Sequence, residues 1–294
     1  MHAPWRKAAG CCRTDDMGYP EFSVAMCVYG GDNPAWFYDA VRSILDQTVV
    51  PSEVVLVVDG PVPDPLECVI REFESQPVFR VIRLPENQGH GNARRASLAH
   101  CSNELVALMD ADDLSVPSRF ERQLACFAEH PEASVIGGNI AEFCGDEENV
   151  VGYRSLPSSD AELREYMKTR CPMNQMTVMF KKSHVEAAGG YVDWYCDEDY
   201  YLWLRMYLRG MRFANVPEVL CRVRVGEDMY RRRGGWRYFK SEAKLQKFML
   251  DENVIRPGTF CMNVLKRLIV QVLLPNRLRG WVFQKFARSC ADHE

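Results

Sequence analysis

Short, continuous apolar runs alternate along the chain with segments whose apolar residues recur at helical spacing. Runs of strand length cover residues 22–29, 54–58, 79–82 and 105–109. Helical spacing separates them, and the first such segment runs from Trp36 to Leu45. Strands that are apolar throughout are typical of a parallel sheet covered by helices on both faces. The pattern predicts an α/β fold with a mostly parallel, Rossmann-like sheet flanked by helices.

The alternation continues beyond the fourth strand. A helix that begins with Pro117 is expected, followed by a strand over residues 133–140, an acidic helix over 161–167 and a strand over 176–180. Past Gly235 the spacing of apolar residues is helical again. We therefore expect a helical C-terminal extension after the α/β domain.

An acidic turn directly follows the strand at residues 105–109. Its carboxylates belong to Asp110, Asp112 and Asp113. Like charges at this density repel one another unless a cation shares them, and carboxylate oxygens suit magnesium, manganese or calcium. An EF-hand calcium loop is excluded because Ser115 occupies the position that requires glycine. A solvated acidic turn that precedes a helix is the other interpretation.

Polar or aromatic residues end three of the predicted strands. Tyr29, Asp59 and Asp110 each lie at the carboxyl end of a strand. In open parallel sheets, ligands bind beyond that edge. We expect the three side chains to share one crevice, and this location favours a metal site over a solvated turn.

A second acidic stretch, Asp197-Glu198-Asp199, leads into a predicted helix. From Asp199 the residues Leu202, Trp203 and Met206 fall on the same helical face. The helix dipole favours the ionised form of a carboxylate in the first turn, whereas partial burial raises its pKa. Asp199 is thus a candidate general base. A cap carboxylate without a catalytic role is the alternative.

Composition narrows the class of function. The chain has 294 residues, of which 47% are apolar, and a formal net charge of -4, so we expect no nucleic-acid partner. The twelve cysteines include no Cys-x-x-Cys pair, which fits a reducing cytosol. No signal peptide and no run of about 18 apolar residues is found. We expect a cytoplasmic protein, or one attached to the inner face of the cell membrane.

The last part of the chain is basic as well as apolar. Residues 261–294 contain six basic side chains and only two acidic ones. The basic residues are Lys266, Arg267, Arg277, Arg279, Lys285 and Arg288. A helix with an apolar and a cationic face is typical of a segment that lies on an anionic membrane surface. Packing of the same face against the domain is also consistent with the pattern.

Together, these segments resemble an inverting family 2 glycosyltransferase of the GT-A fold. The matching pieces occur in the family's order: Val28-Tyr29-Gly30-Gly31, residues 41–48, Val57-Val58-Asp59-Gly60, Asn87-Gln88-Gly89 with Ala93-Arg94, residues 109–113 and residues 198–203. They span about residues 22 to 225. Details such as Pro172-Met173-Asn174 are similar to the bacterial branch that builds capsules and exopolysaccharides.

The resemblance assigns a nucleotide-sugar donor, commonly a UDP-sugar. Tyr29 and Asp59 match positions that hold the nucleoside by stacking and by a carboxylate hydrogen bond to the base. Arg94 and Asn87 match the nucleotide side of the family's site. The implied acceptor is a hydroxyl of a saccharide or of a lipid-linked saccharide in surface polysaccharide synthesis.

The resemblance also implies a metal and a base. Asp110 would contact the ribose or a metal-bound water, and Asp112 would ligate a divalent cation, Mg or Mn, that bridges the diphosphate. Asp199 matches the base that deprotonates the acceptor hydroxyl. A histidine that some relatives carry soon after Leu220 is missing here. Nearby arginines from Arg222 onward could contact the diphosphate instead, or form a solvated basic surface.

The implied organisation has three parts. Residues 1–21 form a flexible leader, and residues 22–232 form the catalytic domain. That domain has a nucleotide-sugar half at about 22–143 and an acceptor half at about 144–232. A basic amphipathic extension follows at residues 233–294.

Two other functions compete with this prediction. A sugar-phosphate nucleotidyltransferase needs a basic glycine-rich loop after the first strand, but residues 30–34 contain no Lys or Arg. A non-catalytic nucleotide-sugar-binding or scaffold protein of a polysaccharide assembly would not require both Asp112 and Asp199. The six histidines are dispersed, and no catalytic role is assigned to them.

Overall fold

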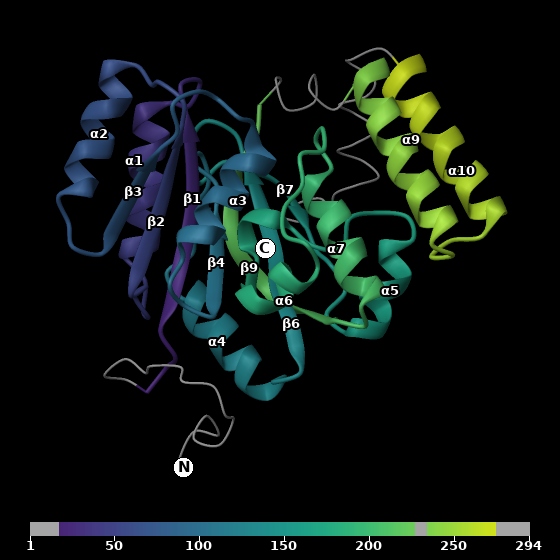
Figure 1. Cartoon of the computed structure of the whole chain (residues 1–294), viewed down its shortest axis with the longest axis horizontal. Helices are drawn as coiled ribbons and strands as arrows, with labels where there is room; N and C mark the ends of the chain where they lie inside the picture. The colour runs from purple at the N-terminus through teal and green to yellow at the C-terminus, as the bar shows by residue number, and fades with distance from the viewer. Residues whose placement is uncertain (1–17, 227–233, 275–294) are drawn as a thin grey trace.

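A mixed β-sheet forms the centre of the protein. The computed structural model describes residues 18–226 and 234–274 (Figure 1). The strands of the sheet are β1 (Phe22–Tyr29), β2 (Glu53–Asp59), β3 (Phe79–Arg83), β4 (Leu105–Met109), β5 (Leu114–Ser115), β6 (Ala133–Phe143), β7 (Val150–Arg154), β8 (Met179–Lys181) and β9 (Arg212–Arg224). Their order is β3-β2-β1-β4-β8-β6-β9-β5, and β7 pairs with β6.

Most of the sheet is parallel, as the apolar runs predict. Strands β1 to β4 pair in parallel, and β6 pairs in parallel with β9. The short strand β8 is antiparallel to both β4 and β6 and therefore joins the two parallel regions. As a result, β4 and β6 point the same way, and the carboxyl ends of β1, β2, β4 and β6 lie at one edge.

Helices cover both faces of this sheet. They are α1 (Pro34–Leu45), α2 (Asp64–Glu74), α3 (His90–His100), α4 (Arg119–Glu129), α5 (Asp160–Met167), α6 (Lys182–Ala187), α7 (Glu198–Leu208), α9 (Trp236–Asp251) and α10 (Pro257–Arg267). Alternate residues of β1 point to opposite faces, so Val24 and Met26 pack with α1, α2 and α4. Ala25 packs in the second cluster, which contains residues of α3, α5, α6, α7 and α9.

The structure corrects several details of the sequence-based prediction. Trp36 does not face the core: its side chain is 40% exposed, and Phe37 is buried instead. Pro117 does not begin a helix, because α4 starts at Arg119 after the short strand β5. The strand predicted over residues 176–180 is a 3₁₀ turn, η2 (Gln175–Thr177), followed by β8.

The C-terminal extension is helical, as predicted, and it contacts the segments that follow α5 and precede α7. Helices α9 and α10 lie side by side at one end of the molecule (Figure 1). Ser241 Oγ donates to the carbonyl of Tyr195 at 2.6 Å, and Asn263 Nδ2 donates to the carbonyl of Lys168 at 2.9 Å. The boundary at residue 233 remains a prediction, and residues 1–17, 227–233 and 275–294 lie outside the described residues.

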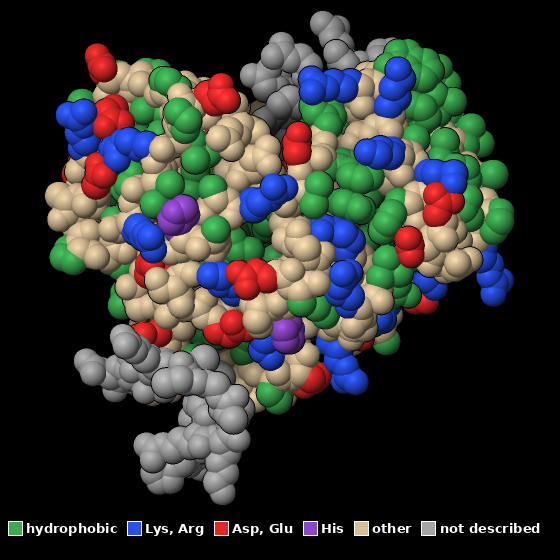
Figure 2. All heavy atoms as spheres, in the orientation of Figure 1, with side chains coloured by type: hydrophobic (Ala, Val, Ile, Leu, Met, Phe, Trp, Pro, Cys, Tyr) green, Lys and Arg blue, Asp and Glu red, His purple; other side chains and the backbone are tan. Residues whose placement is uncertain are grey.

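One face of α10 and of the π-helical turn η3 (Leu268–Leu273) leaves apolar side chains exposed. The apolar stripe consists of Met262 (52% exposed), Leu265 (52%), Ile269 (42%) and Leu273 (66%). Figure 2 shows hydrophobic side chains gathered over this end of the molecule, with Lys and Arg side chains beside them. Within the described residues, no helix is both long and apolar enough to cross a membrane.

Trp203 tests the packing of α7 on the sheet. Its side chain is fully buried, so Trp203→Ala should lower the free energy of unfolding by about 3–5 kcal/mol. Equilibrium unfolding in urea measures the change. Leu208→Ala, at an exposed position of the same helix, is the control and should cost less than about 0.5 kcal/mol. Equal losses for the two variants would contradict the described packing.

Candidate active site

The three predicted strand-end residues meet at one edge of the sheet. Tyr29 pairs in register with Asp59 across β1 and β2, and β4 ends at Met109 on the other side of β1. Asp110 follows directly. The carboxyl edge of the sheet therefore carries Tyr29, Asp59 and Asp110 together, as the sequence predicts.

Asp59 organises the loop that follows β3. Its side chain is 4% exposed, and its two carboxylate oxygens accept the backbone N–H groups of Gln88 at 2.7 Å and Gly89 at 3.1 Å. Asn87 Nδ2 donates to the Asp59 carbonyl at 3.2 Å. Gly60 must be glycine here, because its φ is +85° and a Cβ would lie 2.5 Å from the Asn87 nitrogen. Asp59 and Asn87 thus fix this loop against the end of β2.

An acidic residue that sequence reasoning missed lies beside Tyr29. The Tyr29 ring is 46% exposed and covers Gly31, where a Cβ would lie 2.6 Å from the ring. Asp32 Oδ2 accepts the Tyr29 N–H at 2.9 Å. Burial, together with the charges of Asp112 and Asp110, raises the pKa of Asp32 to about 6. In the sequence, Asp32 directly follows the two glycines after β1, and this position could have indicated a site residue.

Arg94 is buried behind Asp110 rather than exposed at the carboxyl edge of the sheet. The residue is 1% exposed and forms an ion pair with Asp110 through Nη2. Nη1 donates to the carbonyls of Ala25 at 3.0 Å and Met109 at 3.2 Å. Arg94 Nε donates to Nε2 of His90 at 3.1 Å. The predicted contact of Arg94 with the nucleotide would therefore act through Asp110 in this structure.

The acidic turn is held from behind by Arg224, near the end of β9. The backbone N–H of Arg224 donates to Asp113 Oδ1 at 3.0 Å, and Nε donates to the Asp112 carbonyl at 3.3 Å. The guanidinium also stacks over Trp36, at 4.7 Å from the ring centre. Burial and the charges of Asp112 and Asp110 raise the pKa of Asp113 well above its ordinary value. Asp113 is therefore a structural carboxyl group that ties the acidic turn to the end of β9.

These carboxylates fit a hard divalent cation that is shared with a ligand. Asp32, Asp112 and Asp110 interact unfavourably as anions, and a cation would relieve that repulsion. In the part of the chain that the structure describes, no three His, Cys, Asp or Glu side chains form a complete metal cage. Magnesium commonly uses only one or two carboxylates and completes its shell with phosphate oxygens and water. The donor set therefore suits a metal that binds together with a diphosphate.

The second acidic stretch lies at the start of α7. Asp199 is partly exposed, and its Oδ1 accepts a hydrogen bond from the backbone N–H of Tyr200 at 2.6 Å. The Cys171 thiol donates to Asp199 Oδ2 at 3.8 Å. Burial and the negative charge of Glu198 raise the pKa of Asp199 to about 7. A carboxylate with this pKa can accept a proton near neutral pH.

The other two carboxyl groups of this stretch face different partners. Burial and the charge of Glu242 on α9 raise the pKa of Asp197 to about 9, so Asp197 is protonated at neutral pH. Glu198 is 7% exposed and lies 2.8 Å from His90 Nδ1. Sequence reasoning gave His90 no role, although its i, i+4 spacing from Arg94 on α3 was a usable signal.

The arginines considered as possible diphosphate ligands contact other protein groups in the structure. Arg222 lies 3.5 Å from Glu147 and 3.4 Å from Glu148, at the surface. Arg224 braces the acidic turn. Residues 231–233 lie outside the described part of the chain.

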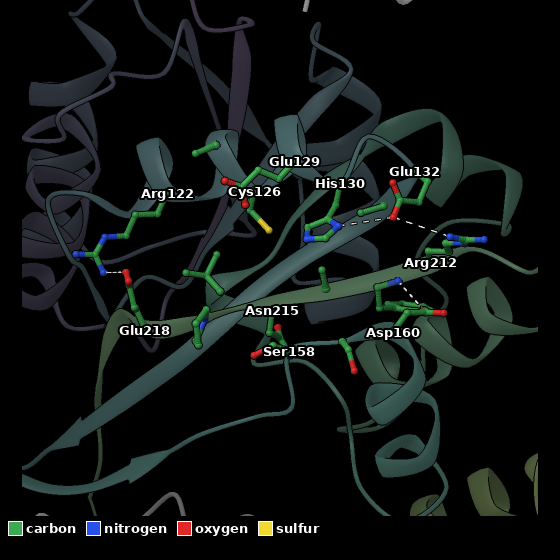
Figure 3. A pocket seen from close by; sticks show the side chains of 17 residues that line it. Arg122, Cys126, Glu129, His130, Glu132, Ser158, Asp160, Arg212, Asn215 and Glu218 are labelled. Atoms are coloured by element: carbon green, nitrogen blue, oxygen red, sulfur yellow. Dashed lines mark hydrogen bonds and ion pairs between the residues drawn. The ribbon is translucent and has the colours of Figure 1, made fainter. Parts of the chain in front are cut away.

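A hollow on the other side of the molecule is not part of this crevice. It lies between α4 and the amino-terminal ends of β6 and β9, whereas the carboxylates lie at the carboxyl edge of the sheet. Figure 3 shows the ion pair of Arg122 with Glu218 on one side of it and Glu132 with Arg212 on the other. Its cations are thus paired with carboxylates, which makes it a poor site for an anionic substrate.

An α/β sheet with carboxylates at its carboxyl edge and a second acidic helix start defines an enzyme that binds its ligand in that crevice. Residues 23–187 match the model of the family "Glycosyl transferase family 2". The chain belongs to this family and is a glycosyltransferase. This membership decides against the nucleotidyltransferase alternative.

Curated relatives match over nearly the whole chain. An uncharacterized glycosyltransferase of Haemophilus influenzae is 39% identical over 92% of this chain and 100% of its own length. The amylovoran biosynthesis glycosyltransferase AmsE of Erwinia amylovora is 35% identical over 90% and 98%. The UDP-Gal:alpha-D-GlcNAc-diphosphoundecaprenol beta-1,3-galactosyltransferase of Escherichia coli is 33% identical over 92% and 97%.

The fold agrees with that of solved glycosyltransferases. A mannosyltransferase from Pyrobaculum calidifontis, in complex with GDP-Man and Mn2+, superposes with a TM-score of 0.60 at 18% identity. The match covers 94% of this chain and 76% of that one. This likeness establishes the GT-A-like fold.

Proposed function

We propose that this family 2 glycosyltransferase moves a sugar from a UDP-sugar to a hydroxyl of a lipid-linked saccharide in bacterial surface polysaccharide synthesis. The observation that carries the proposal is a pair of acidic groups from distant parts of the chain that contacts through Arg94 and His90 link. Asp110 and Asp112 lie at the donor edge of the sheet, and Asp199 lies at the start of α7. The Escherichia coli relative named for UDP-Gal and a diphosphoundecaprenol acceptor supports the choice of substrates.

On the donor side, the exposed Tyr29 ring offers a stacking surface for the nucleoside base. Asp59 and Asn87 shape the adjoining loop, whose backbone lines the same end of β2. Asp110, fixed by Arg94, faces the ribose and diphosphate side. These residues bind and orient the donor so that its anomeric carbon faces α7.

A divalent cation, Mg or Mn, would be held by Asp112 and Asp110 together with the donor's diphosphate. When bound, it neutralises the charge that develops on the leaving diphosphate. The mannosyltransferase with Mn2+ and GDP-Man has the same fold, which supports this assignment.

On the acceptor side, Asp199 takes the proton of the attacking hydroxyl. The acceptor oxygen forms the new bond to the anomeric carbon as the bond to the diphosphate breaks on the opposite face, so the configuration inverts. The Cys171 thiol and the Tyr200 N–H hold the two oxygens of Asp199. Its pKa of about 7 matches a base that accepts one proton per turnover and then releases it to water.

The roles proposed for Asp112 and Asp199 predict different effects on donor binding and on turnover. Asp112→Ala should lose metal-dependent binding of the donor, because the diphosphate then lacks its cation. Asp199→Asn should bind the donor normally, but its kcat should fall by about 10²–10⁴-fold, because the base is lost. Calorimetry and the release of UDP from UDP-galactose, UDP-glucose and UDP-N-acetylglucosamine, with Mn²⁺, Mg²⁺ or chelator, measure both.

Asp64→Asn, at an exposed position on α2, is the control and keeps wild-type binding and turnover. Donor binding that is independent of metal would contradict the role of Asp112. Wild-type turnover by Asp199→Asn would exclude Asp199 as the base.

The pH dependence of kcat tests the environment of Asp199. Only the ionised carboxylate accepts a proton, so kcat should fall as the pH drops below about 7. Glu198→Gln removes a neighbouring negative charge that raises this pKa, and the acidic limb should move to lower pH. Its amide oxygen can still accept a hydrogen bond from His90. If the acidic limb of the pH profile of kcat does not move, Glu198 does not influence the pKa of Asp199.

We also propose that the apolar stripe contacts the membrane that holds the lipid-linked acceptor. Its apolar side chains lie on one face of α10 and η3, and the exposed Lys266 directly follows Leu265 on α10. A face of this kind suits an anionic lipid surface, because its apolar residues enter the interface while a neighbouring lysine meets the headgroups. Trp236, at the start of α9 and 58% exposed, adds an interfacial aromatic.

Leu265→Glu combined with Ile269→Glu should weaken binding to phosphatidylglycerol vesicles by more than about tenfold, because two apolar side chains leave the interface. Sedimentation with vesicles measures the effect. Val151→Glu, on the exposed side of β7, is the control. Vesicle binding that is the same for all three proteins would contradict the membrane role.

A further inference from the structure

Four polar side chains form a continuous series of contacts from the acidic turn after β4 to the start of α7. Arg94 pairs with Asp110, and Arg94 Nε donates to His90 Nε2 at 3.1 Å. On the other side of the same ring, His90 Nδ1 lies 2.8 Å from Glu198 Oε1. We call Asp110, Arg94, His90 and Glu198 the polar bridge. It joins the donor-side carboxylates to the first turn of α7.

The partners of His90 define its tautomer. Arg94 Nε–H can only donate, so His90 Nε2 has to accept and carries no proton. The ring proton is then on Nδ1 and is donated to Glu198. The imidazole therefore has one acceptor and one donor, each pointing at a fixed partner on a different element.

The donor end of the polar bridge is rigid. Arg94 is 1% exposed, and its Nη1 donates to backbone carbonyls of both β1 and β4, at Ala25 and Met109. A buried guanidinium with these partners cannot move without leaving buried donors unsatisfied. The sheet therefore fixes Arg94, and Arg94 fixes the ring of His90.

At the acceptor end of the polar bridge, the backbone of α3 packs on the segment that leads into α7. A Cβ on Gly91 would lie 3.0 Å from the Val192 carbonyl oxygen and 3.4 Å from the Asp193 Cα. Arg95 Nε donates to the carbonyl of Tyr191 at 2.8 Å. The first turns of α3 thus pack closely on the segment that leads into α7. Within that contact, His90 reaches furthest along the chain, to the residue next to Asp199.

We propose that His90 is a positioning residue that sets the place of Asp199 relative to the donor carboxylates. This inference rests on the proposed function. The side chain of His90 is 46% exposed, so the hydrophobic core does not require it, and its two hydrogen bonds define its role. Because reaction rates depend steeply on the alignment of base and nucleophile, a small displacement of α7 reduces turnover far more than donor binding.

Three substitutions separate the two hydrogen bonds of the ring. His90→Phe keeps the ring and removes both bonds. His90→Asn places an amide N–H near the position of Nδ1 and can still donate to Glu198. His90→Gln places an amide oxygen near the position of Nε2 and can still accept from Arg94. We expect His90→Phe to lower kcat at least about tenfold, with Asn and Gln between it and the wild type.

Donor-side measurements distinguish positioning from a general loss of structure. The donor KM, the affinity for UDP with Mn²⁺ and the urea unfolding midpoint should stay close to wild type in all three variants. In a Glu198→Leu background, His90→Phe should have little further effect on kcat, because the polar bridge is already broken. His100→Phe, on the last turn of the same helix and bonded to the Ala96 carbonyl at 2.8 Å, is the matched control and keeps wild-type kcat.

Wild-type kcat in His90→Phe would overturn the positioning role. Equal losses in all three variants, with a weaker affinity for UDP, would also overturn it and assign His90 to donor binding. The proposed function fails separately: it fails when Asp199→Asn turns over as fast as the wild type. If Asp199→Asn is inactive while His90→Phe is fully active, the positioning role of His90 is wrong and the proposed function stands.

Discussion

The burial of Arg94 is the constraint on which the crevice depends. A guanidinium that is 1% exposed must satisfy its donors inside the protein, since an unpaired buried charge is strongly destabilising. It does so with carbonyls of β1 and β4, with Asp110 and with His90. One side chain therefore ties the ends of two strands to a donor-side carboxylate and to the first turn of α3.

Around this fixed point, the crevice concentrates negative charge. Asp32, Asp110, Asp112 and Asp113 lie close enough to influence one another, and burial adds to the cost of ionising Asp32 and Asp113. In the proposed function, a bound cation would relieve this repulsion. Arg224 contributes by holding the turn from behind, which keeps the carboxylates of the turn in place before the donor arrives.

The acceptor side is built differently, from one helix start supported by its neighbours. Glu198 raises the pKa of Asp199 and accepts from His90, so a single carboxylate both affects the protonation of its neighbour and contacts α3. Asp197 faces Glu242 of α9, and Ser241 of the same helix bonds to the preceding segment. Helix α9, which packs against the helix α10 that carries part of the apolar stripe, is thus in direct contact with the loop that enters α7.

The sequence by itself determined the parallel sheet, the edge where Tyr29, Asp59 and Asp110 meet, and the helix that starts at the second acidic stretch. These follow from local apolar spacing and from the geometry of parallel strands. Tertiary structure alone decided that Trp36 is exposed, that Arg94 is buried and that His90 reaches Glu198. Each of these depends on partners distant in sequence, and the spacing of apolar residues carries no information about which distant polar groups will meet.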